Sequence, residues 1–329
     1  MKKRYWFLTL LLLAVSITYF AGPTPPEPVY TANLPELPEA LTDLENHVIS
    51  KEKQQPTRND NQARIRWYDN AIQQTEFSIV YLHGFAGSYR DGYPVNVQLA
   101  DSIKANSYLA RWGGHGLKPP FSMNNFSPDT AWESAKEALA IGKKIGRKVI
   151  ILSTSTGGTL AIKLAAEFPN DIFAIINLSP NLEDDQTGTY ILETRWGYEI
   201  ASLVSMGKNK EIEEKGLAQQ YWDTLYPSKA LVELQVLVGT TMVDSTFKKV
   251  TCPVLTLYYH ENFYKEDEHV EVDIYKDVHD LFSTPDSLVE LTALPTPRSH
   301  FLGSAIKSQD TEIVLKEILQ FLEKINVKI

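Results

Sequence analysis

The stretch Val149-Ile150-Ile151-Leu152-Ser153-Thr154-Ser155-Thr156-Gly157-Gly158 decides the fold of this 329-residue chain. Its apolar half predicts a buried strand, and the segment after Thr156 has the period of an amphipathic helix. A turn this tight strains its central residue and presses strand against helix, so the positions two before and two after Ser155 must be small. Ser153 and Gly157 meet this requirement. The alternative is an ordinary turn in which Ser155 and Thr156 only cap the helix.

Short apolar runs alternate with segments of helical period along most of the chain. This alternation is typical of a largely parallel sheet with crossover helices. The expected strands are 63–68, 77–82, 108–111, 149–153, 174–178, 254–259 and 288–294, and the expected helices are 131–146, 160–168 and 311–325. The predicted fold class is therefore α/β, with a mostly parallel central sheet flanked by helices.

Residues 181–250 interrupt the alternation with aromatic-rich helical sequence, which predicts a helical cap insertion. An insertion at the carboxyl ends of the strands lies over the place where ligands bind in open α/β sheets. Its aromatic residues are expected to shape an apolar pocket, and the alternative is that they form the core of the insertion itself. These residues are Tyr190, Trp196, Tyr198, Tyr221 and Trp222.

A second turn, His83-Gly84-Phe85-Ala86-Gly87, closes the expected strand 77–82. Such a loop can present a backbone N–H group to a developing negative charge, and so can the start of the helix after Ser155. We assign these two oxyanion donors to Phe85 and Thr156.

A serine hydroxyl needs a base to act as a nucleophile at neutral pH, and histidine suits that task. Of the seven histidines, His300 follows the last expected strand and lies in the loop before the final helix. The base is expected to follow the nucleophile and the acid along the chain, and His300 has this position. His300 is therefore the candidate base for Ser155.

The base must be held in one tautomer by a carboxylate that falls between the penultimate core strand and the histidine. We favour Asp267 because Asp267-Glu268-His269-Val270 places it at a loop tip before an apolar segment, and Glu266 is the next candidate. The neighbouring histidines also permit a metal site. We disfavour it because nothing fixes their spacing on one face.

The N-terminus combines a cationic start, Met1-Lys2-Lys3-Arg4, with an uncharged run from Tyr5 to Gly22. A run of this length can just cross a bilayer, and cations on its first side place the N-terminus in the cytoplasm. We expect residues 1–22 to be a membrane anchor or signal segment. The protein would then be single-pass, with its catalytic part on the periplasmic side, and the alternative is secretion after signal cleavage.

Six prolines between residues 23 and 38 block helix formation, so this interval is predicted to be an extended spacer. Residues 39–329 are expected to form the main domain, with the insertion at about 181–250. The net charge of −9 argues against nucleic acid as a partner. A single cysteine, Cys252, excludes an intrachain disulfide.

Together these residues resemble the α/β-hydrolases, and within them the carboxylesterase and monoacylglycerol-lipase-like branch. The resemblance covers about 63–325 and depends on His83-Gly84-Phe85, Gly114-His115-Gly116, the Ser155 turn, Asp267 and His300. The order serine, acid, histidine is the one that fold uses. The chain departs from the usual pattern of these proteins at two places. Ser153 stands where glycine is commoner, and the interval from His260 to Asp267 is longer than usual.

The resemblance implies hydrolysis of a small-molecule ester, with an apolar acyl group, through an acyl-enzyme and without metal or organic cofactor. Two other functions stay open on the same scaffold. One is a peptidase or amidase, because fold does not fix chemistry. The other is a non-catalytic envelope binding protein that keeps the pocket.

Overall fold

The computed structural model describes residues 2–183 and 189–329, with side chains for 5–183 and 190–329. Within these residues the core is an eight-stranded sheet in the order β1-β3-β2-β4-β5-β8-β10, with β9 paired to β8. Only β1 and β9 run antiparallel to their neighbours. The strands are β1 (Arg64–Arg66), β2 (Thr75–Leu82), β3 (Asn106–Leu109), β4 (Gly146–Thr154), β5 (Ile172–Leu178), β8 (Val254–Asn262), β9 (Lys265–Glu266) and β10 (Val289–Leu294).

Strand β4 lies in the middle of the sheet because its second half is apolar on both faces. Val149, Ile150, Ile151 and Leu152 are all buried, as a strand covered by helices on both sides requires. The predicted mostly parallel sheet is confirmed. Because the parallel strands share one direction, β2, β4, β8 and β10 end at the same edge.

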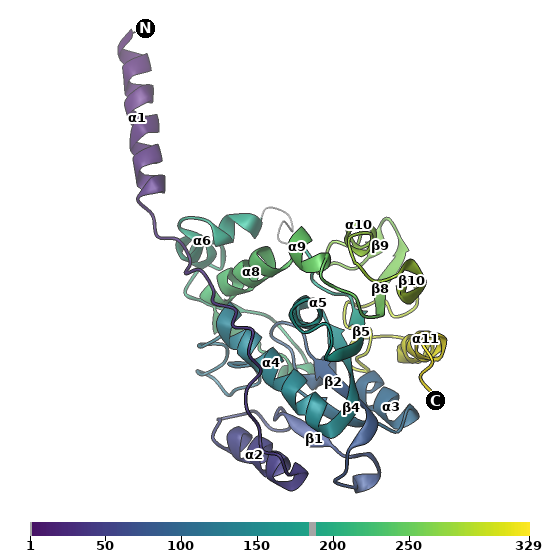
Figure 1. The fold of residues 1–329 in the computed structure, drawn as a ribbon. Coiled ribbons are helices and arrows are strands. Elements are labelled where there is room, and N and C mark those ends of the chain that lie inside the picture. The colour runs from purple at the N-terminus through teal and green to yellow at the C-terminus, as the bar shows by residue number, and fades with distance from the viewer. Residues whose placement is uncertain (1, 184–188) are drawn as a thin grey trace.

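Helices cover the two faces of the sheet (Figure 1). One apolar core contains side chains of α2 (Leu41–Lys53), α4 (Pro128–Ile145) and α5 (Thr156–Glu167). The other contains side chains of α3 (Val95–Ser102) and α11 (Thr311–Lys324). Helix α4 begins with a capping box, in which Ser127 Oγ accepts the Thr130 N–H and Thr130 Oγ1 accepts the Ser127 N–H.

The chain between β5 and β8 forms the predicted insertion, of which residues 184–188 lie outside the described residues. Its helices are η3 (Thr189–Glu193), α6 (Gly197–Val204), α7 (Ala218–Tyr221), α8 (Lys229–Thr241) and α9 (Asp244–Phe247). It also contains a two-stranded antiparallel sheet of β6 (Asn209–Glu211) and β7 (Leu225–Pro227), which the sequence did not predict. The remaining short helices of the described chain are η1 (Tyr68–Asn70), η2 (Tyr89–Asp91), α10 (Tyr275–His279) and η4 (Asp286–Leu288).

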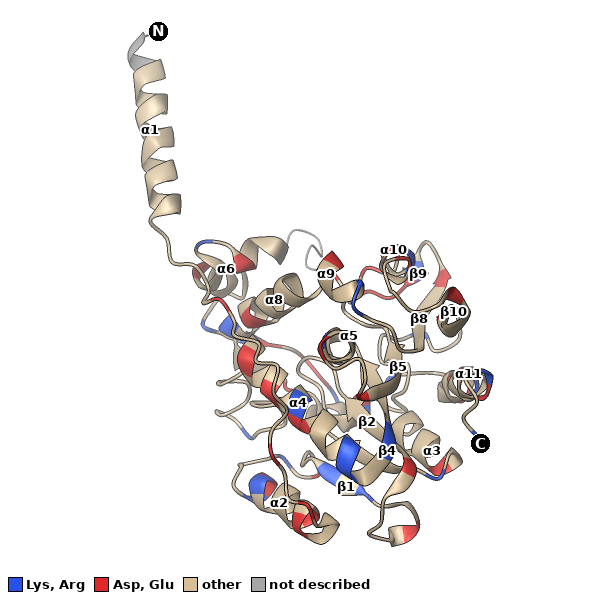
Figure 2. Cartoon of the chain, in the orientation of Figure 1, with Lys and Arg blue, Asp and Glu red and all other residues tan. Residues whose placement is uncertain are grey.

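Helix α1 (Lys2–Phe20) projects away from the rest of the protein beside α6 (Figure 1). From Tyr5 to Phe20 the helix contains no acidic or basic residue (Figure 2). Among the described residues, no helix combines the length and the apolar character needed to cross a membrane. The membrane anchor stays a prediction from the sequence.

The proline-rich interval 23–38 lies along α4 (Figure 1). The Val29 N–H donates to Asp129 Oδ1 at 2.8 Å, and the Trp132 indole N–H donates to the Thr31 carbonyl at 2.8 Å. The Tyr30 hydroxyl lies 2.7 Å from Thr240 Oγ1 on α8. The interval contains no helix or strand, and residues 29–31 are docked on the protein because their polar groups find partners there.

Candidate active site

Ser155 lies in the sharp turn between β4 and α5, with φ 54° and ψ −121°. A positive φ is strained for serine and is held here because the surroundings fix the turn. A Cβ added at Gly157 would lie 2.1 Å from the Leu82 carbonyl oxygen, so this position requires glycine. The departure at Ser153 is accommodated because its hydroxyl donates to Asn177 Oδ1 on β5 at 2.8 Å.

Asp267 and His300 lie in direct contact. His300 Nδ1 is 2.9 Å from Asp267 Oδ1 and 2.8 Å from Oδ2, and both residues are only 6% exposed. Burial alone would raise the pKa of Asp267, but the charge and hydrogen bond of His300 and the His269 N–H outweigh it, so this pKa lies below its usual value. Glu266, the next candidate acid, instead lies 3.2 Å from His260 Nδ1.

The long interval before Asp267 is a hairpin. Strand β8 continues to Asn262, and β9 returns beside it with His260 opposite Glu266. The Asp267 N–H then donates to the Tyr259 carbonyl at 3.1 Å, which fixes the start of the following turn. The extra residues therefore extend the sheet edge and leave Asp267 next to His300.

Ser155, His300, Phe85 and Thr156 line one cavity of about 300 Å³. The structure records no hydrogen bond between the Ser155 hydroxyl and the His300 ring, both of which it describes. Such bonds are often long before substrate binds. Among the described residues the Phe85 N–H has no backbone partner, and Thr156 is the first residue of α5, where N–H groups lack intrahelical acceptors.

The cavity wall is largely apolar. Its aromatic members are Phe85, Trp222, Tyr226 and Phe301. Of the five aromatic residues predicted from the insertion, only Trp222 lines this cavity. Tyr221 turns away and donates its hydroxyl to Asp60 at 2.8 Å, and the Tyr198 hydroxyl donates to Glu233 at 2.8 Å. Trp196 joins the insertion to the N-terminal segment, where its backbone N–H donates to the Pro23 carbonyl at 2.8 Å. Tyr190 is 50% exposed.

An ion pair joins the insertion to the main body across the cavity. Lys307 Nζ lies 2.7 Å from each carboxylate oxygen of Glu214, and it also lies 5.1 Å from the Trp222 ring centroid. Trp222 in turn contacts Phe301 edge to face, with ring centroids 5.3 Å apart. The sequence did not single out Glu214, Lys307 or Phe301.

The loop at Phe85 is supported from below by His83. The His83 ring stacks on Trp112, with centroids 4.7 Å apart, and His83 Nε2 accepts the Trp112 N–H at 3.3 Å. Burial lowers the pKa of His83 to about 4, so this ring is neutral at pH 7. His83 is thus a packing residue beneath the candidate oxyanion loop.

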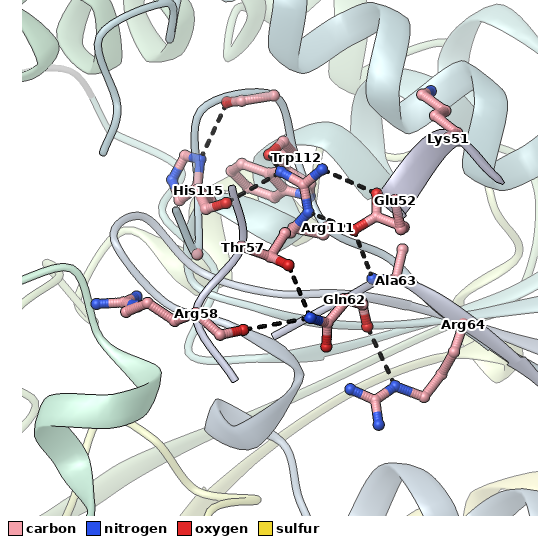
Figure 3. Close-up of polar contacts among 12 residues, drawn as sticks. Lys51, Glu52, Thr57, Arg58, Gln62, Ala63, Arg64, Arg111, Trp112 and His115 are labelled. Atoms are coloured by element: carbon pink, nitrogen blue, oxygen red, sulfur yellow. Dashed lines mark hydrogen bonds and ion pairs between the residues drawn. The ribbon is translucent and has the colours of Figure 1, made fainter. Parts of the chain in front are cut away.

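A buried ion pair between Arg111 and Glu52 lies next to the loop that contains Trp112 and His115. Arg111 donates to both carboxylate oxygens of Glu52 on α2, at 2.7 and 2.8 Å. The same guanidinium donates to the His115 carbonyl at 3.0 Å (Figure 3). Bidentate geometry fixes direction as well as distance, so α2 and the loop at His115 are tied together.

One further histidine lies at the site. The His269 ring lines the cavity, with its centroid 4.8 Å from that of His300, and burial together with the charge of His300 lowers its pKa. Its position two residues after Asp267 was the only sequence signal that could have indicated it. The described side chains gather no group of three or more histidine, cysteine or acidic residues able to hold a metal ion.

No known family model matches the chain, and no curated protein matches it in sequence. Several solved structures are similar to it. One belongs to the metagenome-derived lipolytic enzymes LipS and LipT, with 16% identity, a TM-score of 0.61, and coverage of 82% of this chain and 99% of that chain. A soluble variant of monoglyceride lipase from Saccharomyces cerevisiae has 14% identity, a TM-score of 0.59, and coverage of 80% and 90%.

A third similar structure is the monoacylglycerol lipase of Paleococcus ferrophilus, with 14% identity, a TM-score of 0.56, and coverage of 80% of this chain and 98% of that chain. At such identities the similarity establishes the arrangement of the elements.

Proposed function

We propose that this chain, which has the α/β-hydrolase fold, is a serine hydrolase that cleaves carboxylic esters through an acyl-enzyme intermediate. One observation carries the proposal. A strained Ser155 lines the same cavity as His300, and the far side of the His300 ring lies against the buried carboxylate of Asp267. Nucleophile, base and orienting acid are the three parts that activate a serine hydroxyl.

In the proposed mechanism Ser155 Oγ attacks the ester carbonyl carbon while His300 Nε2 takes the hydroxyl proton. Asp267 accepts the hydrogen bond from His300 Nδ1–H, so it holds the ring with Nε2 free to act as the base and stabilises the imidazolium that forms. The carbonyl oxygen becomes an oxyanion, which the N–H groups of Phe85 and Thr156 receive.

Collapse of this intermediate breaks the bond to the alcohol oxygen, and His300 gives its proton to the departing alcohol. A water molecule then attacks the acyl-enzyme with His300 again as base. The second collapse releases the carboxylic acid and returns the proton to Ser155 Oγ.

The substrate class follows from the wall of the cavity. Side chains such as Leu231, Leu234 and Tyr226 favour an apolar acyl group. A volume of about 300 Å³ is at the small end for a ligand site, so we expect a compact acyl group. The lipolytic and monoglyceride lipase names of the similar structures support ester cleavage.

The proposal is tested with protein lacking residues 1–22, assayed on p-nitrophenyl esters of graded chain length and on aminoacyl amides. We expect ester hydrolysis that is strongest for short chains, and labelling by a fluorophosphonate probe. Both should disappear in Ser155→Ala, while its thermal unfolding matches that of the parent.

Three outcomes would contradict the proposal in different ways. Labelling that persists in Ser155→Ala removes Ser155 from its role. Faster turnover of amides than of esters makes the protein an amidase. Tight ligand binding without labelling or turnover makes it a binding protein.

For the location we propose attachment to the cytoplasmic membrane with the hydrolase part outside. Its support is the charge pattern of residues 1–22 and the exposure of apolar side chains such as Trp6 and Phe7, 70% and 67% respectively. Full-length protein should appear in the membrane fraction with an intact N-terminus. A soluble form that begins after residue 22 would support signal cleavage instead.

A further inference from the structure

A second buried carboxylate, Asp91, lies behind the candidate active site. It belongs to the short turn η2 and has no exposed surface. Among the described residues no lysine, arginine or histidine forms an ion pair with it. A buried carboxylate without a cation must be stabilised by hydrogen-bond donors or become neutral.

The donors of Asp91 come from the two segments that shape the site. Asp91 Oδ2 accepts the Gly84 N–H at 2.7 Å, one residue before the proposed oxyanion donor Phe85. Asp91 Oδ1 accepts the Tyr81 hydroxyl. That hydroxyl also lies 2.9 Å from Thr154 Oγ1, one residue before Ser155. The carboxylate thus links the oxyanion loop to the turn that holds the nucleophile.

The backbone of Gly84 and Gly87 packs closely against the Asp91 carboxylate. A Cβ added at Gly87 would lie 2.5 Å from Asp91 Oδ2. A Cβ added at Gly84 would lie 3.1 Å from Ser155 Cβ and 3.2 Å from Asp91 Oδ2. Gly84 therefore fits between the carboxylate and the nucleophile, so a shift of Asp91 displaces the loop against Ser155.

The segment that contains Asp91 also touches the loop of the proposed base. The Ala305 N–H donates to the Tyr93 carbonyl at 2.8 Å, and Pro94 pairs with Ser304 in an isolated bridge. The charge of His300 lowers the pKa of Asp91, although burial outweighs this effect. All three proposed catalytic parts, loop, nucleophile and base, thus lie around one carboxylate.

We propose that Asp91 is a positioning residue for the proposed reaction, and that its ionised carboxylate holds the Gly84–Phe85 loop in place and favours the His300 imidazolium formed during turnover. This inference rests on the proposed serine hydrolase function. Asp91 does not line the cavity that contains Ser155 and His300. It acts through the Gly84 N–H and through its charge.

Protonation of Asp91 gives the inference a pH signature. Burial raises the pKa of Asp91 to about 7, although the hydrogen bonds from Tyr81 and Gly84 and the charge of His300 act in the opposite direction. The titratable groups that face it in the described structure are Tyr81 from β2 and His300 from the loop after β10. A proton on Asp91 removes an acceptor from Gly84 or Tyr81, so activity should fall as the pH drops through about 7.

The test is the pH dependence of kcat/KM for ester hydrolysis by Asp91→Asn. The amide has the same shape, but it neither titrates nor carries charge. We expect kcat to fall by about 10- to 100-fold with little change in KM, because the loop is misplaced in the transition state. We also expect the acid limb of the profile to move to lower pH by about half a unit or more, because one acidic titration is lost.

Two further variants separate positioning from general damage. Tyr81→Phe removes one donor and keeps the carboxylate, so it should lower kcat and keep an acid limb, which moves to higher pH because the hydrogen bond that lowers the pKa of Asp91 is lost. Asp277→Asn, an exposed acid on α10, should change neither quantity. Thermal unfolding of each variant reports folding independently of activity.

The inference is overturned if folded Asp91→Asn keeps the parent kcat and the parent acid limb. It is also overturned if the acid limb stays in place while kcat falls, because that pattern fits a structural role alone. Failure of the proposed function looks different, since Ser155→Ala would then retain activity or probe labelling.

Discussion

At the scale of single residues, Asp267 is the acid with the most clearly defined task. Both its oxygens contact His300 Nδ1, and one of them also accepts the His269 N–H at 2.9 Å. Because its pKa is lowered in the folded protein, its contribution to stability is present above the pKa of the unfolded chain and is lost as the pH falls through the folded pKa.

Asp267→Asn should lower kcat for ester hydrolysis by about 10³- to 10⁴-fold, because an amide can donate to His300 Nδ1 and so favours the wrong tautomer. The measurement is steady-state hydrolysis of a p-nitrophenyl ester. Glu266→Gln is the matched control and should stay within a few-fold of the parent, since Glu266 contacts His260 instead. A larger loss in Glu266→Gln than in Asp267→Asn would reverse the assignment.

Cys252 is 6% exposed, and burial raises the pKa of its thiol to about 12. The thiolate is the form that reacts, so iodoacetamide at pH 8 should leave the native protein unlabelled. Labelling should appear only with global unfolding in urea, as followed by mass spectrometry. Rapid labelling of the native protein would show that this part of the core opens locally.

At the scale of elements, the approach of α5 to β2 depends on the missing side chain of Gly157. Gly157→Ala places a methyl group against the Leu82 carbonyl, so it should destabilise the protein by about 3 kcal/mol, at the upper end of overpacking. Ester hydrolysis should fall by about 100-fold as Ser155 shifts.

Gly207→Ala is the control for Gly157→Ala, because a Cβ there meets no atom within 4 Å. Its urea unfolding midpoint and its activity should match those of the parent. Equal effects of the two substitutions would mean that the close approach at Gly157 does not hold in solution.

The ion pair of Glu52 and Arg111 joins α2 to the loop at His115, with side-chain exposures of 7% and 6%. Glu52→Ala leaves a buried guanidinium unpaired and should cost about 3–5 kcal/mol of unfolding free energy in urea. The exposed pair of Arg66 and Asp101, 35% and 50% exposed, provides the comparison. Asp101→Ala should cost less than about 1 kcal/mol, and a similar loss in both variants would argue against the buried pair.

The elements that could be predicted from the sequence were those with strong periodicity. The runs 149–153 and 311–325 match β4 and α11 closely, because each carries a clear apolar pattern. Helix α3 was missed because it is short and begins after Pro94 without a side-chain cap. Strand β9 was missed because a two-residue strand has no measurable period.

The candidate site was predictable where chain order carries information. The serine, acid and histidine follow strands β4, β8 and β10 in turn, so chain order indicated candidates for the three roles. Of these, Asp267 and His300 lie in contact. Asp91 and the ion pair of Lys307 with Glu214 follow no motif. Their positions depend on how separate loops pack, which a local pattern does not contain.

At the scale of the whole molecule, residues 29–33 join the N-terminal segment to α4 and α8. Lys136 on α4 is 1% exposed, and its ammonium group contacts Thr31 Oγ1 and donates to the Asn33 carbonyl at 3.0 Å. Lys163 adds a cation–π contact with Tyr30, 4.3 Å from the ring centroid. Residues 30–33 thus contact two buried lysine side chains, Lys136 from α4 and Lys163 from α5.

Protein that begins at residue 23 should keep the thermal stability of the parent, whereas protein that begins at residue 35 should lose about 2–5 kcal/mol, because several hydrogen bonds disappear. Unfolding in urea measures the difference. Lys136→Met in the longer protein should lose part of the same stability, since it removes the ammonium group that donates to the Asn33 carbonyl. Equal stability of the two truncated proteins would mean that the interval is undocked in solution.

The hydrogen bond from Ser153 to Asn177 has a consequence for how other proteins of this kind are recognised in genomes. A pattern search that demands glycine two places before the nucleophile passes over this chain. A search based on the structure would also accept serine two places before the nucleophile when the paired residue of the neighbouring strand has a polar acceptor. Ser153 and Asn177 form such a pair. Proteomes scanned with that paired condition should yield hydrolase candidates that the glycine signature leaves behind.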